Sequence, residues 1–390
     1  MPKTRETLRL DVRKTYKLYV NGAFVRSESG RSDVVGGGTD DSANVARASR
    51  KDLRDAAVAA RAAFVRWSGM TPINRGLVLY RLAEMMDARR AEFVERLRLG
   101  MKVDEALALR ETTAAIDRTL WYAGWCDKYA AVLSSRNPVA GPYYNYSSPE
   151  PMGIVGVVAP DEPSLLGLVS ALVPPLVSGN TVVAIASEID PRTAIVFAEC
   201  LATSDLPAGA ANVLTGRRIE IAPHLARHMD VNAILTYGLD APFAAELERL
   251  AADNLKRTRM RGAGTSPEWF AAEAQDLEHV AAFVETKTIW HPAGILEASP
   301  WKTTAPTFLS TTFTPPRPII PKQPPRSVRF TKSIRARAPT PQNSRRTRRA
   351  FARFPISSAL SNAGGSTRTS KPSSPNSTPP DCDRHAQAEG

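Results

Sequence analysis

A few residues that could bind a ligand follow short apolar runs in the middle of the chain. They are Pro160, Ser187, Glu188, Gly216 and Gly238. If the runs are strands of a parallel sheet, these residues meet at the edge where such sheets bind their ligands. Glycine lets backbone approach a ligand closely, and the carboxylate of Glu188 can accept hydrogen bonds from ribose hydroxyls. The pattern predicts a nucleotide site made of these five residues.

Glu188 has a second interpretation. A carboxylate is stabilised at a helix N-terminus, and Ser187-Glu188 precede the Asp190-Pro191 start of a predicted helix. Asp161 and Glu162 also lie at a predicted helix start, which favours a structural role over an acid–base role. From the residues alone, both interpretations of Glu188 stay open.

The elements that must position these residues alternate between strand and helix. Strands that are apolar on both faces and separated by helices form a parallel sheet with right-handed crossovers. The sequence therefore predicts a doubly wound, Rossmann-like α/β fold. The predicted strands are GIVGVVA (153–159), TVVAIA (181–186), NVLT (212–215) and AILTY (233–237), and the predicted helices cover 163–177, 192–203, 219–228 and 241–253.

The N-terminal 130 residues predict mostly helices instead of alternating strands and helices. Asn21-Gly22 lies in the middle of the alternating segment 17–25, which predicts a tight hairpin. Ser49 stands three residues before Asp52, as in a capping box, and Thr71-Pro72 is a cap followed by a proline at the first helical position. We expect one helix after each of these signals and a third over roughly 104–131, beside a small sheet element.

Charge divides the chain near residue 300. The whole chain has a net charge of +12, but residues 301–390 hold 16 Lys and Arg against 3 Asp and Glu, so residues 1–300 are nearly neutral. The last 90 residues also contain 14 of the 31 prolines. This composition predicts a globular domain over 1–300 and a disordered basic tail over 301–390. The arginines of NSRRTRRAFARF (343–354) could hold nucleic acid, and a shifted reading frame could also produce such a tail.

Several classes of protein are disfavoured. Cys126, Cys200 and Cys382 share no metal-binding spacing, and an odd number of cysteines argues against a disulfide framework, so we expect a reduced, cytoplasmic setting. His224 and His228 lack a third metal ligand, so no metal is expected. The start of the sequence is charged and has no apolar run, so we expect no secretory signal, and no apolar run is long enough to predict a membrane span.

Seven segments in order resemble the NAD(P)-dependent aldehyde dehydrogenase superfamily, from about Lys17 to about Ile295. The resemblance implies a nicotinamide cofactor, NAD or NADP, bound on the sheet. It also implies a catalytic cysteine that attacks the aldehyde, hydride transfer, and hydrolysis of the thioester by water that a glutamate activates. The segments are LYVNGAFV, AAFVRWSGMTPINRG, SPEPMGIVGVVAP, PPLVSGNTVVAIASE, LPAGAANVLTG, HMDVNAILTYG and NLKRTRMRGAGTSP.

The catalytic positions of that family are replaced. Glu162 stands where an asparagine stabilises the oxyanion, Arg261 where a glutamate is the general base, and Ile295 where a cysteine is the nucleophile. An arginine is always protonated and cannot abstract a proton. At the cofactor positions, a lysine of the family is missing before Glu188, and Leu239 replaces a phosphate-binding serine. We expect a catalytically impaired dehydrogenase with residual cofactor binding.

Two other functions remain open from the sequence. The chain could be a non-catalytic partner of an intact aldehyde dehydrogenase, or a homo-oligomer, that docks through the sheet around Asn180–Val183 and its helices. Nucleic-acid binding through the basic tail is the second alternative, and the disordered composition of the tail disfavours it.

Overall fold

The computed structural model describes residues 14–36, 41–262 and 268–293. Ile295 and the basic tail over 301–390 lie outside these ranges. The predictions made for them therefore stay predictions.

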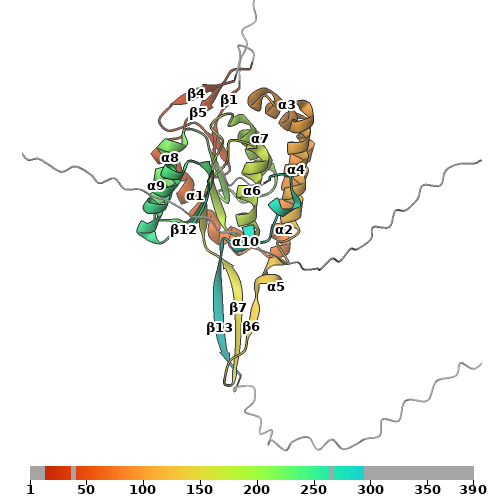
Figure 1. The fold of residues 1–390 in the computed structure, drawn as a ribbon, viewed down its shortest axis with the longest axis vertical. Coiled ribbons are helices and arrows are strands. Elements are labelled where there is room, and N and C mark those ends of the chain that lie inside the picture. The colour runs from red at the N-terminus through yellow and green to blue at the C-terminus, as the bar shows by residue number, and fades with distance from the viewer. Residues whose placement is uncertain (1–13, 37–40, 263–267, 294–390) are drawn as a thin grey trace, which may run out of the picture. The chain divides into compact units, whose positions relative to one another are not determined.

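A seven-stranded sheet forms the centre of the described chain (Figure 1). Its strand order is β12-β11-β8-β9-β10-β2-β3, and the neighbours from β12 to β10 are parallel. The hairpin of β2 and β3 adds antiparallel strands at one side. The predicted doubly wound α/β fold is confirmed. The strands are β2 (Leu18–Val20), β3 (Ala23–Val25), β8 (Ile154–Val158), β9 (Thr181–Ile185), β10 (Ala211–Leu214), β11 (Val231–Leu239) and β12 (Arg257–Gly262).

Helices cover both faces of this sheet and create two separate apolar cores. On β8, Val155 and Val157 face one core, and Ile154 and Val158 face the other. Because both faces are buried, the strand is apolar at consecutive positions. The first core is covered by α2 (Pro72–Ala88), α3 (Arg90–Met101), α4 (Glu105–Ala123), α6 (Ser164–Val177) and α7 (Arg192–Thr203), and the second by α1 (Arg50–Ser68), α8 (Arg218–Arg227) and α9 (Ala241–Ala251) (Figure 1).

The local signals in the N-terminal region act as predicted. Asn21 and Gly22 have φ values of 53° and 75°, which the tight turn between β2 and β3 requires. Ser49 and Asp52 form a reciprocal capping box at the start of α1. The hydroxyl of Thr71 accepts a hydrogen bond from the Asn74 N–H at the start of α2.

Some boundaries differ from the prediction. The helix expected after Thr71 is divided into α2 and α3 at Arg89, whose φ of −107° is not helical. The helix expected over 104–131 ends at Ala123, and the short α5 (Tyr129–Leu133) follows it. The apolar spacing runs through both breaks, which is why it does not reveal them.

Two three-stranded sheets were not predicted. One has the order β1-β5-β4, with β1 (Thr15–Tyr16), β4 (Ser32–Val35) and β5 (Ala43–Ala46). The other has the order β13-β7-β6 and extends away from the helices (Figure 1). It consists of β6 (Ser135–Asn137), β7 (Tyr143–Pro151) and β13 (Val284–Pro292).

A buried carboxylate positions the helix that follows β8. Helix α6 begins at Ser164 without a side-chain cap of its own. Instead, Glu111 of α4 accepts hydrogen bonds from the N–H groups of Leu165 (2.8 Å) and Leu166 (3.2 Å). Burial raises the pKa of Glu111 above its ordinary value of 4.5, although the two N–H groups and the helix dipole oppose the shift. Asp161 and Glu162, the acids expected at this helix start, are therefore not its cap.

We predict that Glu111→Gln alters how stability depends on pH. The raised pKa in the folded state means that the wild type takes up a proton on folding. Its free energy of unfolding therefore falls as pH rises from about 4.5 through the folded-state pKa. An amide oxygen can still accept the two hydrogen bonds but does not titrate. The stability of the variant relative to the wild type should thus increase over that range and then level off.

Urea unfolding of both proteins between about pH 4 and about pH 8 measures this difference. Glu84→Gln is the matched control, because Glu84 is an exposed residue of α2. Parallel pH profiles for the wild type and the Glu111 variant would contradict the assignment.

Candidate functional site

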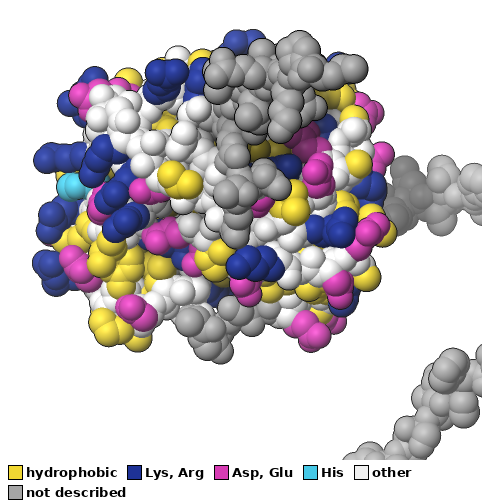
Figure 2. Space-filling model, turned by 90° about the horizontal axis from the view of Figure 1, so that it is seen from above, with side chains coloured by type: hydrophobic (Ala, Val, Ile, Leu, Met, Phe, Trp, Pro, Cys, Tyr) yellow, Lys and Arg dark blue, Asp and Glu magenta, His cyan; other side chains and the backbone are white. Residues whose placement is uncertain are grey.

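The loops after the parallel strands meet at one end of the molecule. β8, β9 and β10 run in the same direction, so the residues that follow Val158, Ile185 and Leu214 lie close together. Figure 2 looks onto the molecule from above, and basic and acidic side chains lie next to one another across this view. A doubly wound sheet binds ligands at this edge, and the residues predicted for the nucleotide site follow the strands there.

An internal ion pair lies across these loops. The guanidinium of Arg218, the first residue of α8, donates two hydrogen bonds of 2.7 Å to the carboxylate of Asp161, which follows β8. It also donates to the carbonyl oxygen of Ala159 (2.7 Å). Asp161 accepts further hydrogen bonds from the hydroxyl of Ser187 and the N–H of Glu188, both at 2.9 Å. The ion pair thus connects the ends of β8, β9 and β10.

The predicted site residues take different places around this ion pair. Ser187 is buried and donates its hydroxyl hydrogen bond to Asp161. The carboxylate of Glu188 accepts a hydrogen bond from the backbone N–H of Arg218. Glu188 therefore lies at a helix N-terminus, as its second interpretation expected, but the helix is α8 and not α7. Pro160 is buried against Gly167 of α6, where a Cβ would approach the proline ring to 2.2 Å.

Glu188 and Gly216 line one groove. It has a volume of about 420 Å³ and lies between these loops and strands β4 and β5. Gly216 has a φ of 134°, and a Cβ there would lie 3.0 Å from the backbone nitrogen of Ala48. Glycine at this position therefore lets the loop after β10 approach the segment after β5. The other lining residues are Asp33, Val34, Val35, Gly36, Val45, Ala46, Ile189, Pro191 and Arg217.

The N-terminus of α9 carries its own anion. Asp240 is its cap and accepts a hydrogen bond from the N–H of Phe243 (2.8 Å). Pro242 lies in the first turn and has no N–H to offer. Gly238 precedes this helix with a φ of 70°, and there is open space beside its Cα. A second anion at this terminus would be repelled by the carboxylate of Asp240.

These residues do not fit a dinucleotide as they stand. The pyrophosphate position implied by the family resemblance is the start of α9, where Pro242 has no N–H and the carboxylate of Asp240 accepts the Phe243 N–H and adds a negative charge. On the ribose side, Glu188 is bonded to the Arg218 N–H, and the Arg218–Asp161 ion pair lies beside it. The groove has room for a ligand, but the polar groups beside it form hydrogen bonds with one another.

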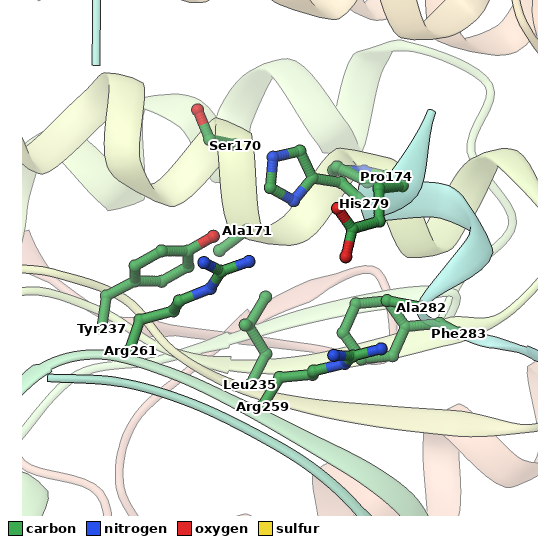
Figure 3. Close-up of a pocket in the computed structure, with 11 residues that line it drawn as sticks. Ser170, Ala171, Pro174, Leu235, Tyr237, Arg259, Arg261, His279, Ala282 and Phe283 are labelled. Carbon is green, nitrogen blue, oxygen red and sulfur yellow. The ribbon is translucent and has the colours of Figure 1, made fainter. Parts of the chain in front are cut away.

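A second, smaller pocket lies between α6 and the strands β11 and β12 (Figure 3). Arg261 lines it, beside Tyr237, which is its neighbour on β11. Glu162 is exposed near the start of α6, and Ile295 is outside the described ranges. The structure therefore places two of the three residues at the family's catalytic positions, and one of these two, Arg261, lines a pocket. The other lining residues are Ser170, Ala171, Pro174, Leu235, Arg259, Glu278, His279, Ala282 and Phe283.

The two cysteines in the described ranges are not nucleophiles at either site. Cys126 and Cys200 are both buried and reduced. Burial raises the pKa of each thiol to about 12, so both are protonated near neutral pH.

No metal centre is formed by the described residues, in which no group of three or more His, Cys, Asp or Glu side chains could hold an ion. His224 and His228 lie near Arg50 and Arg227, and burial followed by these cations lowers the pKa of His224. Within the same ranges, no helix is both long enough and apolar enough to cross a membrane.

Sequence reasoning missed the residues that fill the site. Arg218 had a usable signal, because Arg217 and Arg218 directly follow Gly216 in the loop after β10. Asp240 also had one, because it stands three residues before Phe243 and just before a proline in the first helical turn. Glu111 had none, because its partner helix is more than 50 residues away in sequence.

Comparison with known proteins identifies the fold. The model of the aldehyde dehydrogenase family matches residues 24–292. DhaS of Bacillus subtilis (strain 168) is 31% identical over 262 residues, which are 65% of this chain and 51% of DhaS. Cytosolic 10-formyltetrahydrofolate dehydrogenase of Xenopus tropicalis is 31% identical over 272 residues, 67% of this chain and 30% of that protein.

Solved structures agree with this result. The NAD+ complex of aldehyde dehydrogenase from Bacillus cereus superposes with a TM-score of 0.60 and 26% identity, over 63% of this chain and 50% of that chain. The chain spans about half the length of DhaS and of this structure. On the family match, which covers more than half of its residues, this chain belongs to the aldehyde dehydrogenase family.

Proposed function

We propose that this chain is a non-catalytic member of its family and does not oxidise aldehydes. The observation that carries the proposal is the position of Arg261, which lines the pocket beside Tyr237 where the family resemblance requires a general base. A guanidinium stays protonated at physiological pH, so it cannot activate water. Glu162 adds a carboxylate where an oxyanion would need a hydrogen-bond donor.

The state of the cysteines also supports a non-catalytic chain. Forming a thioester requires a thiolate, and both cysteines of the described chain are buried and protonated. The sequence has isoleucine at the position that aligns with the family's nucleophile. Restoring the base alone would therefore not restore turnover.

We predict no acid formation when the purified chain is incubated with NAD or NADP and a panel of aldehydes. Arg261→Glu should be equally inactive, because the nucleophile is still missing. The measurement is NAD(P)H absorbance together with detection of the acid, and an intact family enzyme serves as positive control. Turnover that a thiol-blocking reagent abolishes would refute the proposal.

Cofactor binding is a separate part of the proposal. The related Bacillus cereus enzyme was solved as an NAD+ complex. In this chain, the carboxylate of Asp240 would repel the phosphates of such a ligand. The Arg218–Asp161 ion pair lies where the ribose would bind. We infer that NAD or NADP binds here very weakly.

We predict no saturable heat when the wild type is titrated with millimolar NAD or NADP in a calorimeter. The double variant Asp161→Asn, Asp240→Asn should gain measurable binding. Asparagine at position 240 still caps α9 but carries no charge, and asparagine at position 161 removes the carboxylate that pairs with Arg218, so the guanidinium is free to pair with an anionic group of the ligand. Equal, saturable binding by both proteins would contradict the inference.

A second candidate function is that of a partner subunit, either in a homo-oligomer or beside an intact aldehyde dehydrogenase. The sheet of β6, β7 and β13 supports it, because large aromatic side chains are exposed there. Side chains alternate along a strand, so Tyr143 and Trp290 lie on one face of this sheet and Tyr144 and Tyr146 on the other, and exposed aromatic groups of this kind are typical of protein interfaces. The docking surface expected around Asn180–Val183 is wrong, because those residues are buried under helices on both faces. The exposed aromatics are Tyr143 (45%), Tyr144 (50%), Tyr146 (44%) and Trp290 (58%).

We predict that Trp290→Ser with Tyr144→Ser weakens association of the chain with itself or with an intact family member. Size-exclusion chromatography with light scattering, on the chain alone and in the mixture, measures this. Val65→Ser is the control, because Val65 is 76% exposed on α1, outside this sheet. A wild type that stays monomeric alone and in the mixture would exclude the subunit role. Nucleic-acid binding by the tail and a cytoplasmic location remain predictions from sequence.

A further inference from the structure

A buried positive charge has no acidic partner among the residues that the structure describes. Arg118 of α4 is 3% exposed, and its guanidinium donates to two neutral acceptors. These are the hydroxyl of Ser170 and the carbonyl oxygen of Trp269, both at 2.6 Å. Its Nε has no hydrogen-bond partner among the described residues. Buried charges are normally paired, so the surroundings of Arg118 are short of negative charge.

A buried hydroxyl lies on the other side of this charge. Tyr237 of β11 is 3% exposed, and its phenol hydroxyl points into the pocket of Figure 3. A phenol hydroxyl can donate one hydrogen bond, so it can serve a ligand in this pocket. Burial, the largest cause, raises the pKa of Tyr237 above its ordinary value of 10.0, so the hydroxyl keeps its proton at neutral pH.

The pocket itself carries more positive than negative charge. Arg259 and Arg261 of β12 line it and make no ion pair with the described acidic residues. Glu278 is the acidic residue in the lining, and burial, the largest cause, lowers the pKa of His279 so that this imidazole is neutral near pH 7. The lining therefore holds two guanidinium groups and one carboxylate, and Arg118 lies behind Ser170 of the lining.

The shape of the pocket selects for a small ligand. The free volume at its centre is about 10 Å³, which is enough for one oxygen-sized atom. Its inner wall is apolar, with Ala171, Pro174, Leu235 and Phe283. Arg259 and Arg261 are exposed and mark the side from which a ligand would enter.

We propose that this pocket binds a small carboxylate, with one oxygen inside the pocket accepting the hydrogen bond of the Tyr237 hydroxyl and the rest of the ligand at the exposed side, against the guanidinium of Arg261. A guanidinium matches a planar carboxylate with two parallel N–H groups. The charge of Arg118, which no side chain of the described chain balances, strengthens the attraction. The inference concerns binding only and does not depend on the absence of turnover.

The test is calorimetric titration of the full chain with sodium acetate at constant ionic strength. The wild type should bind acetate saturably. Arg261→Gln and Tyr237→Phe should each weaken binding about tenfold, as expected when a hydrogen bond to a charged group is lost. Arg66→Gln is the matched control, because Arg66 is exposed on α1 outside the pocket, and it should bind as the wild type does.

Circular dichroism and the unfolding midpoint of each variant show whether it is folded, and Tyr237→Phe removes a single oxygen from an otherwise unchanged ring. A second readout is the thermal midpoint of the wild type, which should rise with acetate and not with the same concentration of chloride. No saturable binding of acetate, equal binding by the wild type and Arg261→Gln, or equal binding of sulfate and acetate would overturn the proposal.

Discussion

The structure depends on the burial of both faces of four parallel strands, β8, β9, β10 and β11. Each of these strands must be apolar toward both cores, so its polar and chemically useful groups are confined to its ends. The helices that cover the faces return the chain to the same edge, and the loops after β8, β9 and β10 therefore meet. The location of the site is thus a consequence of packing, whereas its chemistry depends on which side chains the loops carry.

In this chain, the loops carry side chains that satisfy one another. Arg218 needs acceptors because it is buried, and Asp161 and the carbonyl of Ala159 supply them. Asp240 satisfies an N–H at the start of α9 in the same way. Polar groups that a ligand would pair in a cofactor-binding protein are here paired internally. Such an arrangement stabilises the ligand-free protein, and any dinucleotide has to compete with it.

The parts of the structure that depend on neighbours in sequence could be predicted. The hairpin at Asn21-Gly22 and the capping box of Ser49 and Asp52 each require only a few residues. The strands β8 and β9 were evident because a parallel strand buried on both faces is continuously apolar. In contrast, the bond between Asp161 and Arg218 joins residues 57 positions apart, and neither residue type by itself indicates a partner.

The apolar pattern of the sequence also did not predict strands with polar sequences. β12 reads Arg-Thr-Arg-Met-Arg-Gly, and its register against β11 is what brings Arg261 beside Tyr237. Because one side of this strand is not covered by another strand in the described chain, it does not need to be apolar. The resemblance to a known family located Arg261 without a strand prediction, but it could not reveal the pocket or the charge of Arg118.

The long antiparallel pair of β7 and β13 has a consequence for how the protein is made. Pro151 pairs with Val284, and the pairing continues to Tyr143 and Pro292. During synthesis, β7 leaves the ribosome more than 130 residues before its partner, with only the three-residue β6 available on its other side. Throughout that interval it is a nine-residue edge strand with exposed tyrosines, a state that invites pairing with another chain. Nascent chains on one messenger RNA are therefore at risk of joining through this strand before each has completed its own sheet.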